Sequence, residues 1–179
     1  MDIEFVVGDL LKLDVEAIVN PANSECEMGG GVARAIRKAG GKEIEEEAMN
    51  QAPVPIGRAI ATSAGKLNFA YIFHAPTMRM PVQTTSAKNV SAAVLAALDL
   101  ACDFGISSLG VPGMGTGTGR LSLEAAAAAM LEAVRRHKSA EGAIEKLVFV
   151  DTNEEMVASW KKVWRQQNAK EKEDEGAPA

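Results

Sequence analysis

The residues of this chain best suited to chemistry are backbone amides and small polar side chains, and they gather in two glycine-rich stretches. The first stretch, residues 17–40, contains Asn20, Asn23 and three consecutive glycines, Gly29, Gly30 and Gly31. Glycines let the backbone approach a ligand without a Cβ in the way and adopt positive φ. Each asparagine amide offers a donor and an acceptor, which suits the hydroxyls of a sugar. The combination indicates a site for a phosphate or diphosphate that carries a sugar.

The elements around this stretch are a strand and a helix. Residues 17–19 form a short apolar run that reads as a buried strand, and we expect it to break at Asn20-Pro21. After the glycines, apolar residues recur at helical spacing from Val32 to Ala39, and glycines at positions 40 and 41 end the pattern. The first turn of such a helix presents unpaired N–H groups at its positive end. The stretch therefore predicts a strand, a loop and a helix N-terminus that bind an anion together.

The second stretch repeats this arrangement. A strand predicted over residues 106–111 leads into Gly113-Met114-Gly115-Thr116-Gly117-Thr118-Gly119-Arg120, and a helix predicted over 122–138 follows, with Ser122 as its N-cap. Two such units in one small domain suggest two walls around one extended, phosphate-containing ligand. No G-x-G-x-x-G aligns within the loop and no Gly-Lys-Ser/Thr follows it, which argues against a dehydrogenase or a nucleoside triphosphatase.

The remaining pattern predicts the fold class. Further strands are expected over residues 3–7, 58–63, 70–75 and 146–150, and further helices over 42–51, 86–104 and 154–166. The strands at 58–63 and 70–75 flank a short turn and are expected to pair antiparallel. The sequence thus predicts an α/β protein, a three-layer α/β/α domain with a mixed, mostly parallel sheet over residues 1–167, followed by a charged, disordered tail over 168–179.

Composition narrows the class of protein. The chain has 179 residues, 47% hydrophobic and 24% charged, as expected for one soluble domain. Its net charge of −5 argues against nucleic acid as a partner. No apolar run is long enough to cross a membrane, and the acidic start lacks the basic region of a signal peptide, so we expect a cytoplasmic protein. Two cysteines, Cys26 and Cys102, form neither a disulfide framework nor a four-cysteine metal site.

The two histidines of the chain are candidate catalytic groups. His74 lies at the end of an apolar strand, where a structural role is the commoner one, and no Cys-His or Asp-His partnership is visible from the spacing. His137 follows two arginines near the end of a predicted helix and is expected to act as a helix-terminal charge. Neither is therefore placed in a catalytic set.

The two glycine-rich stretches also carry a family resemblance. Residues 17–24 together with 29–36, AIVNPANS and GGGVARAI, resemble the signature of the macro domain family, whose members bind ADP-ribose and in many cases remove it from derivatised substrates. The resemblance runs from about Ile3 to Trp164. It implies that the acid of Asp9 accepts a hydrogen bond from the adenine amino group, that Leu10 lines the base pocket, and that Asn23 orients the distal ribose. Val150, where some members carry an aromatic residue, would contact adenine.

Two departures from the family pattern bear on activity. A hydrolytic branch of the family has an aspartate where this chain has Ala33, so the carboxylate that helps to place water is absent. Many members have an aromatic residue, stacked on the distal ribose, where this chain has Gly119. The resemblance therefore implies binding first and turnover second.

The sequence thus predicts a protein that binds ADP-ribose, or a protein or small molecule that carries ADP-ribose, through two phosphate loops. It also predicts slow, substrate-assisted hydrolysis of ADP-ribosyl esters, with Asn23 as the candidate catalytic residue. An efficient ADP-ribosyl hydrolase or an ADP-ribose 1''-phosphate phosphatase is the alternative, and an NAD-type oxidoreductase ranks below both. No cofactor and no metal ion is predicted. The predicted ligand-binding residues are Asp9, Leu10, Asn20, Ala22, Asn23, Gly29, Gly30, Gly31, Val32, Ala33, Gly113, Met114, Gly115, Thr116, Gly117, Thr118, Gly119 and Val150.

Overall fold

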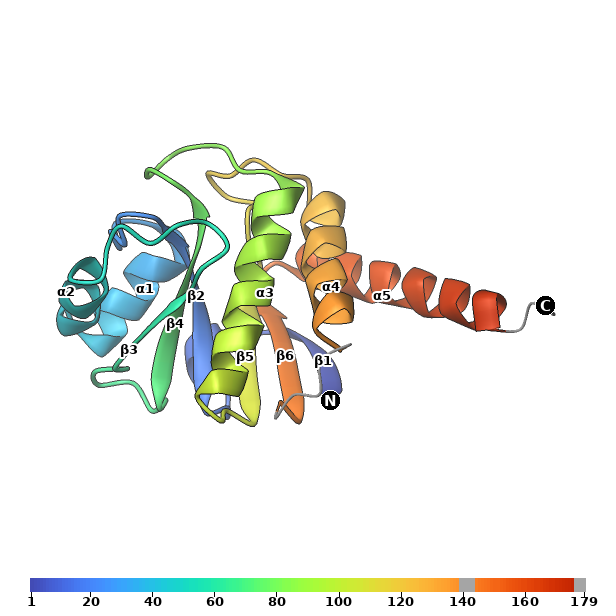
Figure 1. Ribbon diagram of the computed structural model, residues 1–179, viewed down its shortest axis with the longest axis horizontal. Helices are drawn as coiled ribbons and strands as arrows, with labels where there is room; N and C mark the ends of the chain where they lie inside the picture. The colour runs from blue at the N-terminus through green and yellow to red at the C-terminus, as the bar shows by residue number, and fades with distance from the viewer. Residues whose placement is uncertain (139–143, 176–179) are drawn as a thin grey trace.

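The computed structural model of the chain describes residues 1–138 and 144–175 and is an α/β domain with one six-stranded sheet (Figure 1). The elements in chain order are β1 (Asp2–Val7), the 3₁₀ turn η1 (Leu10–Lys12), β2 (Ala17–Asn23), α1 (Gly31–Gly40), α2 (Glu43–Met49), β3 (Ile60–Thr62), β4 (Tyr71–Met78), α3 (Ala87–Asp103), β5 (Ser108–Pro112), α4 (Leu123–Lys138), β6 (Lys146–Asp151) and α5 (Glu154–Glu175).

The sheet has the strand order β1-β6-β5-β2-β4-β3. Every neighbouring pair runs parallel except β3 and β4, which are antiparallel. The mixed, mostly parallel sheet and the antiparallel hairpin predicted from the sequence are therefore confirmed. Because the parallel strands share one direction, the loops that follow β1, β2, β5 and β6 meet at one edge of the sheet.

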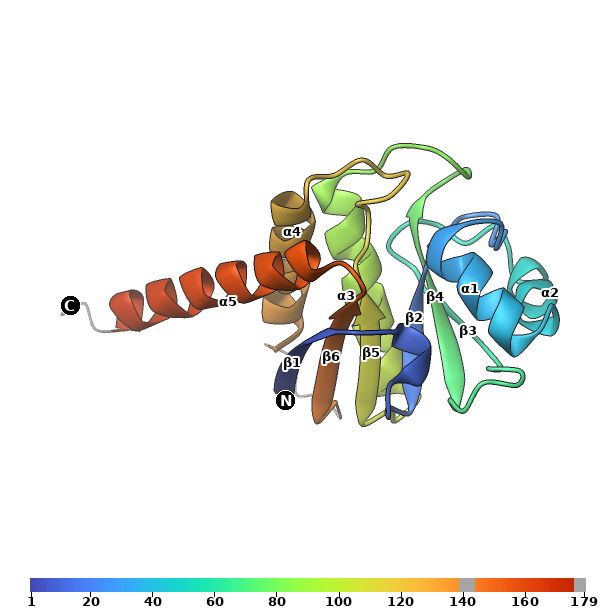
Figure 2. The same cartoon turned by 180° about the vertical axis from the view of Figure 1, so that it is seen from behind.

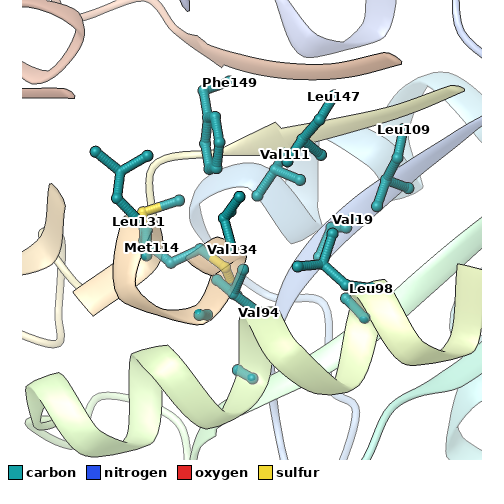
Figure 3. Packing of buried hydrophobic residues seen from close by; sticks show 14 of the residues in the cluster. Val19, Val94, Leu98, Leu109, Val111, Met114, Leu131, Val134, Leu147 and Phe149 are labelled. Carbon is teal, nitrogen blue, oxygen red and sulfur yellow. The ribbon is translucent and has the colours of Figure 1, made fainter. Parts of the chain in front are cut away.

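Helices cover both faces of the sheet. Helices α3 and α4 lie in front of it in Figure 1, and the view from behind shows α1 and α2 on the other side (Figure 2). Alternating residues of β2 enter different apolar clusters: Val19 joins the cluster with α3, α4 and α5, and Ile18 joins the cluster with α1. Figure 3 shows the larger cluster, where Val94 and Leu98 of α3 and Leu131 and Val134 of α4 approach strand residues such as Phe149.

Strand β2 does not break at Asn20-Pro21 as expected but continues to Asn23. It pairs with β5 only at Ala17 and Ile18, whereas its pairing with β4 runs the whole length. Beyond Ile18 the side towards β5 thus has no ladder hydrogen bonds to lose, and Pro21, which lacks an N–H, is tolerated there. The extension carries both asparagines on a strand rather than in a loop.

Helix α5 is longer than predicted and continues to Glu175 instead of ending near Gln166. The added residues are mostly lysine, glutamate, glutamine and alanine, which favour helix, and the first glycine comes only at position 176. Both overall views show this part of α5 extending away from the sheet (Figures 1 and 2). The boundary at residue 167 between domain and tail stays a prediction, and residues 176–179 lie outside the described part of the chain.

Within residues 1–138 and 144–175, none of the helices is both long enough and apolar enough to cross a membrane.

Candidate functional site

A cavity of about 240 Å³ opens at the carboxyl ends of β1, β5 and β6, beside the N-terminus of α1. In parallel sheets this edge is where ligands usually bind. The cavity draws its walls from four separate segments of the chain. Its lining residues are Gly8, Asp9, Leu10, Leu11, Gly31, Val32, Ala35, Pro112, Val150, Asp151 and Thr152.

The start of α1 forms a polar wall of this cavity. Gly30 is the N-cap residue and provides no side-chain cap, so the first amides of α1 have no partner within the helix. Gly31 has φ of 54°, which a residue with a side chain rarely adopts. A Cβ placed on Gly29, Gly30 or Gly31 meets no atom within 4 Å, so the backbone there borders open space. Unpaired N–H groups and the positive end of the helix dipole together favour an anion at this wall.

The loop after β1 forms the opposite wall. Asp9 caps the η1 turn, its Oδ1 accepting a hydrogen bond from the Leu11 amide at 2.9 Å. Its side chain is exposed, and its other carboxylate oxygen remains free to accept from a ligand. Leu10 and Val150 are buried in the apolar cluster beneath α1 and also line the cavity. These three residues, predicted to hold the adenine base, are thus brought together around one apolar, partly acidic space.

The second glycine-rich loop borders this cavity through the residue that precedes it, Pro112. The loop is closed on itself by hydrogen bonds from Leu121 N to Gly115 O at 2.9 Å and from Arg120 N to Gly117 O at 3.1 Å. Gly117 is exposed and a Cβ there meets nothing within 4 Å, so its backbone is open to a ligand. Met114, a predicted ligand residue, instead points into the core beside Leu131 (Figure 3).

Gly119 occupies a crowded position within the same loop. A Cβ built on it lies 2.6 Å from the carbonyl oxygen of Gly115 and 2.7 Å from Cγ2 of Thr85. The amide of Thr85 also donates to the carbonyl of Gly119 at 3.0 Å. No side chain fits here unless the backbone moves. The loop is therefore folded too tightly to hold an aromatic residue at position 119.

Asn20 is committed to a buried polar chain between β2, β4 and β3. Its Nδ2 donates to Nδ1 of His74 at 3.0 Å, and Nε2 of His74 lies 2.9 Å from Oγ1 of Thr62. Since Nδ1 accepts, Nε2 carries the proton and donates to Thr62. Burial lowers the pKa of His74 to about 4, which keeps the ring neutral. His74 is therefore structural in this fold, and Asn20 contacts it instead of lining the cavity.

Asn23 holds the turn that leads to the three glycines. Its Oδ1 accepts from the amides of Glu25 at 3.0 Å and Glu27 at 3.4 Å, and its Nδ2 donates to the carbonyl of Glu27 at 3.1 Å. The second Nδ2 hydrogen has no such partner, but Asn23 is 8% exposed and is not among the residues that line the cavity. The side chain therefore fixes the entry to the glycines before it contacts anything bound. Ala22 and Ala33, also predicted as ligand residues, are 5% and 7% exposed and face the interior.

Sequence reasoning missed part of the cavity wall. Asp151 and Thr152 follow β6, and the rule that ligands bind past the carboxyl ends of parallel strands already indicated that position. Ala35 lies one helical turn beyond Gly31, so helical spacing indicated it as well. The other missed residues are Gly8, Leu11 and Pro112.

Among residues 1–138 and 144–175, no group of three or more His, Cys, Asp or Glu side chains is arranged to hold a metal ion.

Comparisons with known proteins give a family match and similar solved structures. The family model described as Macro domain matches residues 19–130. An uncharacterized protein of Aquifex aeolicus is 47% identical over 91% of this chain and 98% of its own length. The Trypanosoma brucei macrodomain in complex with ADP-ribose is 26% identical, with a TM-score of 0.79 over 89% of this chain and 68% of that one. A macrodomain mutant of Oceanobacillus iheyensis with ADPR shares the fold, with a TM-score of 0.80 at 24% identity over 91% of each chain.

Proposed function

Because the chain belongs to the macro domain family, we propose that its cavity binds ADP-ribose, either free or attached to a protein or small molecule. One observation carries the proposal: a single cavity joins the apolar pocket beside Asp9 to the unpaired amides of α1. ADP-ribose has the same sequence of parts, a flat base followed by a diphosphate between two riboses. The similar Trypanosoma brucei macrodomain was solved in complex with ADP-ribose, which supports this choice of ligand.

The base end of the ligand is assigned to the loop after β1. The adenine ring packs against Val150 and Leu10, and its amino group donates to the free carboxylate oxygen of Asp9. Apolar contact and one well-placed acceptor are the usual elements of such a base pocket. This arrangement favours adenine over ligands that consist of a ribose phosphate alone.

The diphosphate is assigned to backbone amides. Gly31 and Val32, in the first turn of α1, line the cavity, and we assign a second set of donors to the exposed backbone at Gly117, which lies outside this lining on the other loop. Amide donors at a helix N-terminus attract an anion locally, so the chain's net charge of −5 does not prevent binding.

The distal ribose is assigned to Asn23, and turnover there is expected to be slow. The remaining Nδ2 hydrogen of Asn23 orients a ribose hydroxyl, while the position of the family's water-placing aspartate is filled by the methyl group of Ala33. The ligand's own diphosphate is then the base for an attacking water, which is substrate-assisted hydrolysis. The function supported best is therefore binding, with slow cleavage of ADP-ribosyl esters as a second property.

Isothermal titration with ADP-ribose, beside NAD and AMP, tests the proposal. We expect micromolar or tighter binding that prefers ADP-ribose. Two exposed alanines of α1 locate the site: Ala35 lines the cavity and Ala39 lies one turn further along the same helix. Ala35→Glu places bulk and negative charge in the cavity and should weaken binding at least about tenfold, since like charges repel there, whereas Ala39→Glu should bind as the parent does.

If Ala35→Glu and Ala39→Glu bind ADP-ribose with equal affinity, the ligand does not bind in this cavity. If the parent protein gives no heat of binding with ADP-ribose, the proposed function is refuted. Incubation with a mono-ADP-ribosylated protein then measures turnover. A turnover rate of a few catalytic cycles per minute or faster would favour the efficient hydrolase over the binding module.

A further inference from the structure

A second group of reactive side chains lies at the opposite end of the sheet from the cavity. Asp99 and Cys102 stand three positions apart on α3 and therefore share one face of that helix. His137 stands in the last turn of α4. Helices α3 and α4 lie side by side and both end away from the glycine-rich loops (Figure 1), so this group is separate from the proposed ligand site.

The three side chains form a hydrogen-bonded chain with the imidazole in the middle. Nδ1 of His137 lies 3.1 Å from Oδ1 of Asp99, and Nε2 of His137 lies 3.5 Å from Sγ of Cys102. A carboxylate only accepts hydrogen bonds, so Nδ1 carries the imidazole proton and Nε2 presents its lone pair to the thiol. The expectation that His137 serves as a helix-terminal charge is thus incomplete, because its ring is 5% exposed and engaged on both sides.

This order of groups matches the arrangement that activates a nucleophile: a nucleophile, a base within reach of its proton, and a third group that orients the base. We propose that Cys102 is a nucleophilic thiol and a site of covalent modification by hydroperoxides, with His137 as the proton acceptor and Asp99 as its positioning residue. Cys102 is half-buried and Asp99 is exposed, so the group is reached from solvent.

The packing of two helices fixes the proton acceptor beside Cys102. Cys102 and Asp99 both lie on α3, and His137 lies in the last turn of α4 with one ring nitrogen directed to each of them. The geometry therefore places a base within reach of the thiol proton.

The reaction balances without further partners. The Cys102 thiol gives its proton to Nε2 of His137, and the thiolate sulfur attacks the terminal oxygen of the hydroperoxide. An S–O bond forms and the O–O bond breaks, so sulfur loses two electrons and the peroxide gains them. The leaving alkoxide or hydroxide takes the proton from His137 and departs as an alcohol or water, which leaves a sulfenic acid on Cys102.

The same geometry argues against a metal site at this position. His137 uses a different nitrogen for each neighbour and lies between them, so the three side chains do not point at one centre. The other thiol, Cys26, provides an internal reference. It is 1% exposed, and burial raises its pKa to about 11.

The test measures the reaction of each thiol in the intact chain by mass spectrometry. The protein is treated with hydrogen peroxide in the presence of dimedone, which traps sulfenic acids, and in a parallel series with iodoacetamide. We expect both reagents to modify Cys102 much faster than Cys26. Modification of Cys102 no faster than that of an unstructured cysteine peptide would overturn the proposal.

Two matched substitutions then separate proton transfer from general electrostatics. Asp99→Asn lets an amide donate to Nδ1, which moves the imidazole proton to Nε2 and removes the acceptor, so the rate at Cys102 should fall about tenfold or more. Asp103→Asn removes the same charge beside Cys102 without touching His137, so the rate should stay the same or rise. Both residues are exposed, and thermal unfolding checks that each variant is folded. Equal rates in Asp99→Asn and the parent would refute the roles of Asp99 and His137.

Discussion

One added methyl group at Gly119 tests how the second glycine-rich loop is built. In Gly119→Ala the new Cβ lies 2.6 Å from the Gly115 carbonyl oxygen, 3.0 Å from its carbonyl carbon and 2.7 Å from Cγ2 of Thr85. Rotation of the Thr85 side chain would break the hydrogen bond that its Oγ1 donates to the Thr77 carbonyl, and the Gly115 carbonyl is held by the Leu121 amide at 2.9 Å. Relief therefore requires a shift of the loop backbone.

The size of the effect follows from these contacts. Overpacking of this kind costs about 1–3 kcal/mol. In a chain of this length each kcal/mol corresponds to roughly 2–4 °C in Tm, so calorimetry should show a fall of about 2–12 °C. The matched control is Gly117→Ala, where a Cβ meets no atom within 4 Å and φ is not positive, so its free energy of unfolding should stay within about 0.5 kcal/mol of the parent.

Titration with ADP-ribose completes this test. A shifted loop moves the amides assigned to the diphosphate, so Gly119→Ala should also bind more weakly, and Gly119→Tyr should not gain affinity although it introduces the aromatic side chain of other family members. An unchanged Tm in Gly119→Ala, or tighter binding by Gly119→Tyr, would show that the loop does not have the packing described above.

Three further predictions concern single side chains. Asp9→Ala should lower the affinity for ADP-ribose by about tenfold, which is the value of one hydrogen bond to a charged group. The affinity for ribose 5-phosphate should stay the same. If titration shows an unchanged ratio of the two affinities, Asp9 does not bind the adenine. Because the pKa of His74 is lowered from 6.5 to about 4, the unfolded chain takes up a proton that the folded chain does not as the pH falls through this window. The free energy of unfolding should then decrease with falling pH by at most about 1.4 kcal/mol per pH unit, as measured by urea unfolding at pH 7 and 5. If His74→Gln shows the same dependence on pH as the parent, His74 is not its cause. Hydrogen bonds from Ser107 and Ser108 lower the pKa of Glu16, so its contribution is present above pH 4.5 and lost below it. Because Glu16 is exposed and solvent screens its charge, Glu16→Gln should cost at most about 1 kcal/mol at neutral pH. The cost should be smaller below pH 4.5, and an equal cost at both pH values would count against the assignment.

Local patterns in the sequence determined much of this protein. Apolar runs, helical spacing and glycine positions are properties of neighbouring residues, so they indicated the strands, the hairpin, the two glycine-rich loops and the helices that follow them. They also placed Asp9, Leu10 and Val150 correctly at the ends of strands, and these residues do share one cavity. The resemblance to macro domains rested on the same local signals.

The partners of individual side chains were decided only by the tertiary structure. Asn20 and His74 are 54 positions apart, and Cys102 and His137 are 35 positions apart, so no spacing rule connects them. The order and register of β2 and β4 place the first pair side by side, and the packing of α3 beside α4, with both helices ending on the same side of the sheet, places the second. The crowding around Gly119 likewise depends on Thr85, from another loop. Periodicity reflects the conformation of one segment, whereas hydrogen-bond partners and free space depend on how distant segments pack together.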